Sequence, residues 1–495
     1  MVVISLKFLL FFVIVFVVYY LPASRISSKY QNIWLFLTSY LFYGLADWKM
    51  IPLLFGATIV FYCIGLWLQF ELGKGHVKNA SYITTLGVAL GVGVLFYFKY
   101  LNFFAESFAR LLNAIGFHVS WNTLNVVLPI GVSFFTFKLI SYIIEIHREH
   151  IKPCKDFIEF GTYIAFFPTI LSGPIDKPNK FIPQLGNVRF FDYGLAVDGC
   201  RQILWGMFTK MCISDNLAPI TDTIWQEYEN FSASTLLMII ILYPIQMYAD
   251  FDGYSNMAIG VGKLLGIRIT NNFKHPFLAR NIAEYWRNWH ISLTGWLTEY
   301  VFSPLNIAFR NLQNWGIVLA IIINFVIIGL WHGANWTFAM FGLYHGLLYI
   351  PLIVSGSFGK NKKLRPNKYG LPKGKDAFKM IGTFMLVAIG LVLFKSPSLG
   401  VAYDFMSSLA NISIFDLSTG YEELEALEFQ PYTFLFVILL LLSEWTCRNR
   451  QHNLELREES FLSGHIFMRR SLYVFIITLL LMCKGVGMQF IYFQF

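Results

Sequence analysis

Long apolar runs with almost no charged residues recur along the whole chain, and they constrain its fold more than any other feature. Of the 495 residues, 56% are hydrophobic and only 14% are charged, whereas a soluble globular domain carries about 25% charged residues. The runs are gapless, which favours membrane-spanning helices over the alternating pattern of an outer-membrane barrel. The sequence therefore predicts an all-α, polytopic integral membrane protein, and it excludes a soluble globule, a disordered chain and a disulfide-stapled scaffold as its main class.

Several of the apolar stretches are shorter than the roughly 20 residues that a helix needs to cross a bilayer. Some of them are therefore expected to be re-entrant or half-helices, and we expect about 11–13 membrane helices in all, within one membrane domain over residues 1–495. The candidate stretches are 3–20, 33–46, 50–70, 82–98, 123–143, 157–172, 200–215, 234–249, 316–330, 336–354, 379–395, 432–446 and 472–488.

The charged residues gather in the connections and predict the orientation of the chain. The net charge is +9, and basic residues crowd the connections 358–379 and 448–470, whereas the connection 404–428 is acidic. By the positive-inside rule the two basic connections are expected in the cytoplasm and the acidic one outside, with Arg25 and Lys29 also inside. A basic membrane face explains the net charge, so that no nucleic-acid partner is expected. The six cysteines form no C-x-x-C pair, and no metal or redox cofactor is predicted.

The segment 250–305 is too polar to face lipid. Read as one helix, residues 282–296 place their large apolar side chains on a single face, which is typical of an amphipathic helix at an interface or inside the fold. The residues of this face are Ile282, Trp286, Trp289, Leu293 and Trp296.

Two histidines are the leading candidates for chemistry. His332 follows the apolar run 316–330 directly, and an ionisable group at membrane depth usually marks a site or a proton path. Gly329 and Gly333 flank it and allow backbone or substrate to approach closely. His290 is the second candidate, since Arg287 one turn earlier disfavours the imidazolium form. A structural role remains an alternative for both histidines.

Two carboxylates, Asp250 and Asp252, follow the nearly uncharged run 231–248. Paired carboxylates can perform acid–base chemistry, but an N-cap and loop at the membrane surface is the favoured interpretation. No histidine pair has zinc-ligand spacing with a Glu or Cys beside it, and no nucleophile-elbow or phosphate-loop motif occurs.

Taken together, these motifs resemble the membrane-bound O-acyltransferase family, in particular its bacterial branch of alginate O-acetyltransferase-like proteins. The combination of W-x-x-W-H-I-S-L at 286–293 with G-L-W-H-G at 329–333 is far more specific than any single motif. The resemblance covers most of residues 90–350, with core motifs at 128–350, and the C-terminus. The matching segments are 128–137, 166–175, 206–217, 250–255, 272–276, 286–293, 329–335 and 490–495.

The resemblance implies helices around a central funnel, with His332 as the catalytic histidine and His290 as a supporting one. It implies acetyl-CoA as the acyl donor from the cytoplasm, an exported polysaccharide as acceptor and a bacterial plasma (inner) membrane location among membrane lipids. An extracytoplasmic SGNH-type acetyltransferase-like partner is expected, because the longest external stretch, about 396–431, is too short for a polysaccharide-binding domain. The candidate substrate-binding residues are Asp250, Trp286, Arg287, Trp289, Trp331 and Asn335, the last as an oxyanion donor.

Two other functions remain as alternatives. One is a D-alanyl transferase for teichoic acid, which takes its acyl group from a carrier protein. The other is a transporter or flippase, which usually shows two related halves with broken helices in matching positions; the sequence shows no such internal repeat.

Overall fold

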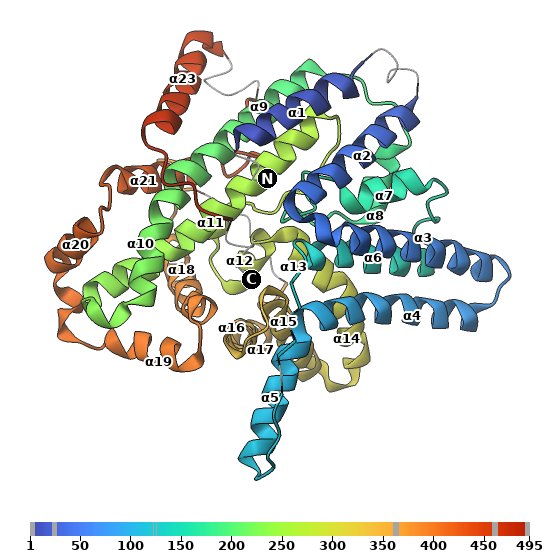
Figure 1. Ribbon diagram of the computed structural model, residues 1–495. Coiled ribbons are helices and arrows are strands. Elements are labelled where there is room, and N and C mark those ends of the chain that lie inside the picture. The colour runs from blue at the N-terminus through green and yellow to red at the C-terminus, as the bar shows by residue number, and fades with distance from the viewer. Residues whose placement is uncertain are drawn as a thin grey trace. The chain divides into compact units, whose positions relative to one another are not determined.

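The computed structural model of the protein describes residues 5–21, 27–121, 123–124, 126–359, 366–457 and 464–490. Every regular element within these residues is a helix (Figure 1). Six helical stretches among them are long and apolar enough to cross a membrane, so that the predicted class of an all-α, multi-pass membrane protein is confirmed. These stretches are Ser28–Gly73, Val77–Ala114, Ala233–Leu264, Arg310–His332, Trp336–Val354 and Gly374–Lys395.

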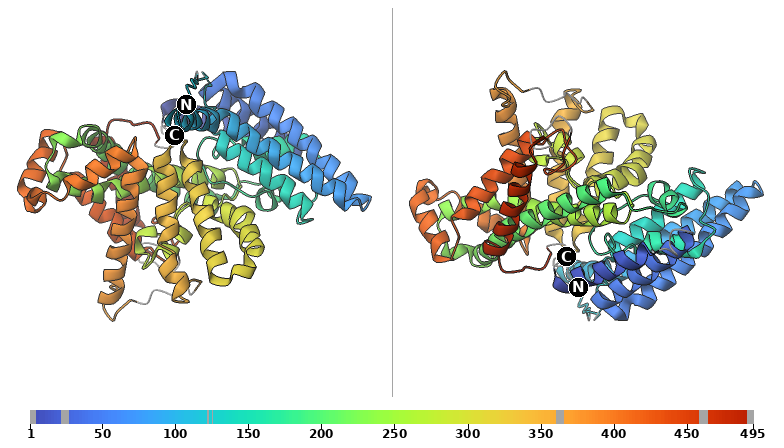
Figure 2. Two further views of the ribbon diagram at one scale, coloured as in Figure 1. Left: turned by 90° about the horizontal axis from the view of Figure 1, so that it is seen from below. Right: turned by 90° about the horizontal axis from the view of Figure 1, so that it is seen from above.

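The chain divides into two compact units, each built from segments that are distant in sequence. The first unit contains Met1–Cys200 and Ala258–Thr270. Within it α3, α4 and α6 pack side by side, and α2 packs against α1 and α7 (Figure 2). Its helices are α1 (Leu6–Tyr19), α2 (Ser28–Asp47), α3 (Ile51–Gly73), α4 (Val77–Leu95), α5 (Leu101–Ala114), α6 (Val132–His147), α7 (Phe157–Ala165), α8 (Pro178–Leu185) and the start of α9 (Tyr193–Phe208).

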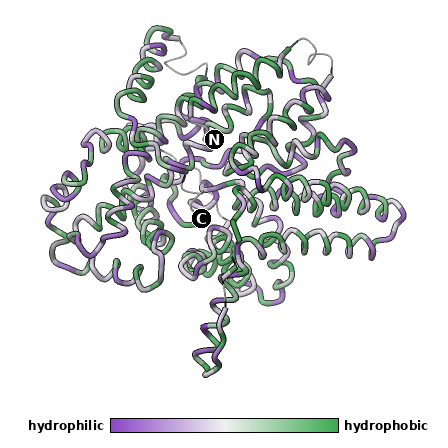
Figure 3. The backbone as a smooth tube through the Cα atoms, in the orientation of Figure 1, coloured by the Kyte–Doolittle hydropathy of each residue, from purple (hydrophilic) through white to green (hydrophobic). Residues whose placement is uncertain are grey.

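Small residues bring the helices of this unit close together. A Cβ atom on Gly91 of α4 would lie 2.6 Å from Cγ1 of Ile140 on α6, and one on Gly87 would lie 3.2 Å from Cγ2 of Ile143. Glycine at such positions lets two membrane helices approach without a cavity. In Figure 3, α3 and α4 are largely hydrophobic, and the turn that joins them is hydrophilic.

The second unit contains Arg201–Met257 and Asn271–Phe495. The pair α15 and α16 forms its most extensive helix contact, and α18 packs on α16. Its helices after α9 are α10 (Asp215–Gln226), α11 (Ala233–Leu264), α12 (Ile282–Asn288), α13 (Ile291–Leu297), α14 (Ser303–Ala308), α15 (Gln313–His332), α16 (Trp336–Leu347), α17 (Ile350–Val354), α18 (Gly374–Lys395), α19 (Leu399–Ser408), α20 (Leu417–Ala426), α21 (Tyr432–Thr446) and α23 (Ile466–Met482).

A break interrupts the run 157–172. Helix α7 begins at its N-cap Asp156, ends at Ala165 and is followed by a non-helical turn through Pro168. The turn is covered by protein, since Phe166, Phe167 and Ile170 are fully buried. Irregular backbone at membrane depth is stable under such a cover.

Three sequence predictions are wrong in detail. The stretch 123–143 becomes helical only at Val132, because Gly131 before it has a φ of +75°. Residues 282–296 form two short helices, α12 and α13, and not one amphipathic helix. Asp250 and Asp252 lie inside α11 with 2% and 7% of their surface exposed, so the loop or N-cap interpretation does not hold.

Some residues named in the sequence predictions lie outside the described residues. They are Arg25, the basic residues between 360 and 365, and the terminal motif beyond Phe490.

Candidate functional site

His332 is the last residue of α15, and its side chain is buried with 4% of its surface exposed. Aromatic rings surround the imidazole. The ring centroid of Trp331 lies 5.0 Å from that of His332, and the ring of Phe394 from α18 lies 5.1 Å away in an edge-on arrangement. The ring of Phe341 from α16 lies at 6.5 Å. Three helices therefore place this histidine in an apolar enclosure.

The glycines beside His332 serve the packing of α15 against α16. A Cβ atom on Gly329 would lie 2.0 Å from the backbone oxygen of Phe338, and one on Gly333 would meet the ring of the same residue. The sequence predicted that backbone or substrate could approach these glycines closely. In the structure, the backbone and the ring of Phe338 on α16 approach them.

His290 lies at the break between α12 and α13, where its backbone adopts φ +44° and ψ +52°. A residue with a Cβ atom pays about 1–2 kcal/mol for this left-handed conformation. Asn272 holds the break in place. Its backbone oxygen accepts from the N–H of Ile291 at 2.8 Å, and its Oδ1 accepts from the Ser292 hydroxyl at 2.6 Å. Its Nδ2 donates to the hydroxyl of Ser255 on α11 at 3.2 Å.

The break brings His290 and His332 together. Their ring centroids are 6.3 Å apart, and the Trp331 ring lies 5.5 Å from His290 as well as beside His332. Phe251 of α11 packs edge-on against His290 from another side, with centroids 4.6 Å apart. His290 is fully buried. Two imidazoles, 42 positions apart in the chain, thus share one aromatic enclosure.

His290 belongs to none of the six candidate spans. Burial first, and the neighbouring His332 second, lower the pKa of His290 well below the usual range of a histidine. The direction of this pKa shift agrees with the sequence prediction of a neutral His290, but its cause is a different one. The break removes the helical spacing between His290 and Arg287, and the exposed Arg287 donates through Nε to the backbone oxygen of Ala283 at 3.0 Å.

Asp250 belongs to a buried ion triad. The ammonium of Lys210 lies 2.5 Å from Oδ1 of Asp250 and 2.6 Å from Oδ1 of Asp215. Each of these side chains is 97% buried, and a buried charge requires such partners. Asp250 thus fixes α11 to the start of α10, and the next residue, Phe251, contacts His290.

The same lysine holds the segment 483–490. Lys210 donates to the backbone oxygen of Met488 at 3.3 Å, and Asn216 donates to that of Cys483 at 3.0 Å. The segment ends with Phe490 against Tyr254 and Phe251, at centroid distances of 4.7 Å and 5.8 Å. The C-terminal part of the chain therefore packs directly behind the ring that contacts His290.

Trp286 and Arg287 line a second feature, a cavity of about 220 Å³. Trp286 is buried, and its indole N–H donates to Nδ1 of His345 on α16 at 3.2 Å. The cavity also holds a polar group from α15: Asn324 is 5% exposed, and its buried Oδ1 has no hydrogen-bond partner among the described residues. The lining is completed by Ala283, Thr294, Thr298, Phe302, Ile321, Phe325, Tyr349, Phe358 and Gly359.

The remaining candidates, Trp289 and Asn335, make contacts within the protein. Trp289 stacks on Tyr285 at 5.4 Å and contacts Phe273 at 5.0 Å. Asn335 caps α16: its Oδ1 accepts from the N–H of Thr337, and its Nδ2 donates to the backbone oxygen of Pro397 at 2.8 Å. Both polar atoms of the Asn335 amide are therefore engaged in the cap and in this cross-link.

Three further residues organise this region: Lys210, Asn272 and His345. Lys210 and Asn272 lie in the matching segments 206–217 and 272–276, but none of the three was predicted as a site residue. Lys210 carried a usable signal, because a lysine inside an apolar stretch requires a buried partner. No local pattern indicated the contacts of Asn272 and His345, because their hydrogen-bond partners are 20 and 59 positions away in the sequence. Among the described residues no group of three or more His, Cys, Asp and Glu side chains is placed to hold a metal ion.

Comparison with known proteins adds an independent line of evidence. The family model of the membrane-bound O-acyltransferases matches residues 147–356. The chain is 32% identical over 431 residues to the probable alginate O-acetylase AlgI of Azotobacter vinelandii, covering 85% of this chain and 80% of the relative. It is 28% identical over 478 residues to the peptidoglycan O-acetyltransferase of Helicobacter pylori, covering 87% and 86% of the two chains. It is 30% identical over 290 residues to the teichoic acid D-alanyltransferase of Streptococcus thermophilus, covering 54% and 68%.

Proposed function

Because this chain belongs to the membrane-bound O-acyltransferase family, we propose that it moves acetyl groups from cytoplasmic acetyl-CoA across the membrane for O-acetylation of an exported polysaccharide. Family membership makes the chain an O-acyltransferase and not a transporter or flippase. Two similar relatives are named for acetyl transfer to polysaccharides, alginate and peptidoglycan. Their similarity extends over most of this chain, which supports the same class of acceptor here.

The observation that carries the proposal is the pair of buried imidazoles, His290 and His332, with ring centroids 6.3 Å apart. In the proposed reaction an acceptor hydroxyl attacks the carbonyl carbon of the acetyl thioester while His332 takes the hydroxyl proton. The carbon–sulfur bond then breaks, and the proton passes from His332 to the departing thiolate. General-base assistance of this kind contributes about 10²–10⁴ in rate.

His290 takes a supporting role in this proposal. A neutral imidazole can accept or donate a hydrogen bond, and the low pKa of His290 keeps it neutral near pH 7. The rings of Trp331, Phe251 and Phe394 enclose the two histidines. An enclosure of this kind excludes water and so limits hydrolysis of the thioester. Trp331 contacts both histidines, and Trp289 supports the enclosure through its contacts with Tyr285 and Phe273.

The cavity beside Trp286 and Arg287 is the proposed binding site of the donor. Its buried acceptor, Oδ1 of Asn324, matches the amide N–H groups of a pantetheine arm, and the Arg287 guanidinium matches a phosphate. Phe358 and Gly359 at its edge begin the basic connection that we assign to the cytoplasm.

We propose Asp250 and Asn335 as positioning residues. Asp250 acts through Lys210 and Phe251, and Asn335 acts as the cap of α16.

A D-alanyl transferase that uses a carrier-protein thioester is the second candidate. The similarity to a teichoic acid D-alanyltransferase covers 54% of this chain, against 85% for the alginate relative. We therefore favour an acetyl donor over a D-alanyl donor.

The proposal has three further parts. The protein is located in the bacterial inner membrane, and residues 1–495 work as one membrane domain. An extracytoplasmic SGNH-type partner receives the acetyl group or places it on the polymer.

Reconstitution tests the proposal. The chain is placed in proteoliposomes with labelled acetyl-CoA on the side of the basic connections and polysaccharide with the extracytoplasmic partner on the other. We expect label in the polymer, and loss of that label with His332→Ala. Polymer labelling without the partner would remove the partner requirement. Turnover of a D-alanyl carrier with indifference to acetyl-CoA would assign the chain to the alternative reaction.

A further inference from the structure

A separate cavity of about 420 Å³ lies in the second unit, between the end of α9, α21, the connection after α21, and α23. Most of its surface is apolar. Phe208 and Leu439 form one side, and Leu472 and Ile476 of α23 form the other. Two arginines, Arg450 and Arg469, also line it. None of the residues that we assign to acyl transfer takes part, so the cavity requires an explanation of its own.

The charged and apolar parts of the lining are ordered along the helices. Arg450 follows the end of α21, and Arg469 lies in the first turn of α23, so both arginines lie at the loop end of these two helices. The lining of α23 continues from Arg469 to Leu479, a length of about 15 Å at 1.5 Å per residue. This length is close to half of the roughly 30 Å hydrocarbon core of a bilayer. The cavity therefore has the dimensions of one leaflet.

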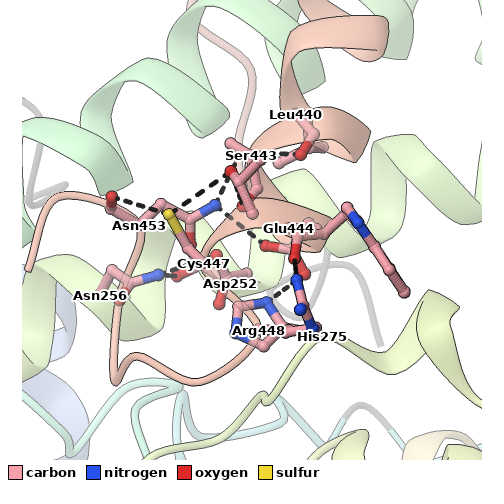
Figure 4. Close-up of polar contacts among 11 residues, drawn as sticks. Asp252, Asn256, His275, Leu440, Ser443, Glu444, Cys447, Arg448 and Asn453 are labelled. Carbon is pink, nitrogen blue, oxygen red and sulfur yellow. Dashed lines mark hydrogen bonds and ion pairs between the residues drawn. The ribbon is translucent and has the colours of Figure 1, made fainter. Parts of the chain in front are cut away.

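The inner wall is polar, and its groups bond to one another (Figure 4). Asn453 donates to the hydroxyl of Ser443 at 2.7 Å and to Oε1 of Glu444 at 3.2 Å. The thiol of Cys447 donates to the backbone oxygen of Asn453 at 3.3 Å. Oε2 of Glu444 lies within hydrogen-bond distance of Nδ1 of His275, at 2.8 Å. The Glu444 carboxylate is thus held by its own partners, Asn453 and His275.

The arginines give the cavity a positive end. Arg450 donates through Nη1 to the backbone oxygen of Glu455 at 3.1 Å, a neutral group that leaves the charge of the guanidinium in place. Arg469 lines the cavity from α23, and both arginine side chains are half-buried. The guanidinium fork suits phosphate oxygens better than any other basic side chain. Basic pockets between membrane helices are typical binding sites for anionic lipid headgroups.

We propose that this cavity binds an anionic phospholipid. Arg450 and Arg469 bind the phosphate, and one acyl chain lies along Leu472 and Ile476 toward Leu479. A zwitterionic phospholipid offers the same phosphate together with a cation that the two arginines repel, so an anionic headgroup is preferred. The bound lipid joins α21 to α23. This inference goes beyond the proposed acyl transfer and does not depend on it.

Native mass spectrometry of the full chain in detergent tests the inference. Delipidated protein is titrated with dioleoyl phosphatidylglycerol and, separately, with dioleoyl phosphatidylcholine. We expect phosphatidylglycerol to bind about tenfold more tightly, a difference of about 1.4 kcal/mol. In the double variant Arg450→Gln/Arg469→Gln the two lipids should bind alike. Equal affinities in the unaltered protein would overturn the proposal.

Arg470→Gln is the matched control, because Arg470 is exposed, adjoins Arg469 and does not line the cavity. This variant should keep the preference for phosphatidylglycerol over phosphatidylcholine. Loss of that preference would contradict the assignment of the lipid site to this cavity.

Ile476→Trp fills the apolar part of the cavity and should weaken the binding of both lipids. Glycerol phosphate, which has no acyl chain, should not displace the lipid at equal concentration. Displacement would show a simple phosphate site and overturn the lipid assignment. Thermal unfolding without lipid checks that each variant folds.

Discussion

His290 combines a left-handed backbone with a fully buried side chain. Non-glycine residues keep such a conformation only where their surroundings impose it, and such residues gather at functional sites. Here the surroundings are Asn272, which bonds both residues that follow His290, and Phe251, which packs on the ring. The break in the helix turns His290 toward His332. Its strain is therefore part of what assembles the pair.

The strain at His290 can be measured by comparing two substitutions. His290→Gly and His290→Ala both remove the imidazole, but glycine adopts positive φ at no steric cost. We expect His290→Gly to be more stable than His290→Ala by about 1 kcal/mol. Thermal unfolding in one detergent compares the two variants. A higher midpoint for alanine would mean that the left-handed backbone at this position is not strained.

His332→Ala should lower acyl transfer at least about 100-fold, which is the smaller end of the contribution expected from a general base. Thermal unfolding should change little compared with this loss. The measurement is labelled acetyl transfer in proteoliposomes beside the unaltered chain. His290→Ala should lose less activity, because its role is supporting. Equal losses in two folded variants would reverse the order of importance of the two histidines.

At the level of elements, Lys210 joins three parts of the second unit: η4 (Thr209–Ser214), α11 through Asp250, and the segment 483–490 through Met488. Removing one partner from a buried ion network leaves uncompensated charge and costs about 3–5 kcal/mol. We expect Lys210→Met to unfold at a clearly lower temperature. Lys210→Arg keeps the charge and should recover part of the loss, as thermal unfolding and acetyl transfer will show. Equal stability of Lys210→Met and the unaltered chain would remove Lys210 from this role.

The close packing of α15 against α16 leads to a second prediction at the level of elements. A Cβ atom on Gly342 would lie 2.1 Å from the backbone oxygen of Phe325, so Gly342→Ala must separate the helices and should cost about 1–3 kcal/mol. The matched control is Gly382→Ala on α18, where a Cβ atom meets nothing within 4 Å. There alanine should stabilise the helix by about 0.5–1 kcal/mol. Thermal unfolding should move in opposite directions for the two variants, and a shift in the same direction would contradict the packing argument.

At the scale of the whole molecule, charge asymmetry predicts the membrane topology. A cysteine at Asp416, in the acidic connection, should react with a membrane-impermeant thiol reagent in intact cells, and one at Lys368, in the basic connection, should not. Both side chains are exposed, so protein burial does not confound the result. The background is a variant in which the exposed Cys63 and Cys200 are serine. The opposite labelling pattern would invert the topology.

Most of the fold was predictable from the sequence, and most of the site geometry was not. Apolar runs indicated the helices because a bilayer requires continuous hydrophobic length. The break at His290 was hidden, because the apolar spacing of residues 282–296 fits one continuous helix. Asp250 was misplaced for a related reason: its partner Lys210 is 40 positions earlier, and pairing across such a distance leaves no local pattern.

The contacts of Phe490 have a consequence for the synthesis of the enzyme. Phe490 packs against Phe251 and Tyr254, and both histidines, Lys210 and Asp250 leave the ribosome long before it. During synthesis, the growing chain therefore already contains both histidines, Lys210 and Asp250 while Phe251 still lacks its neighbour Phe490. A stop codon a few residues before 490 removes Phe490 and therefore leaves this packing incomplete. Nonsense mutations shortly before codon 490 should accordingly behave like lesions in the site.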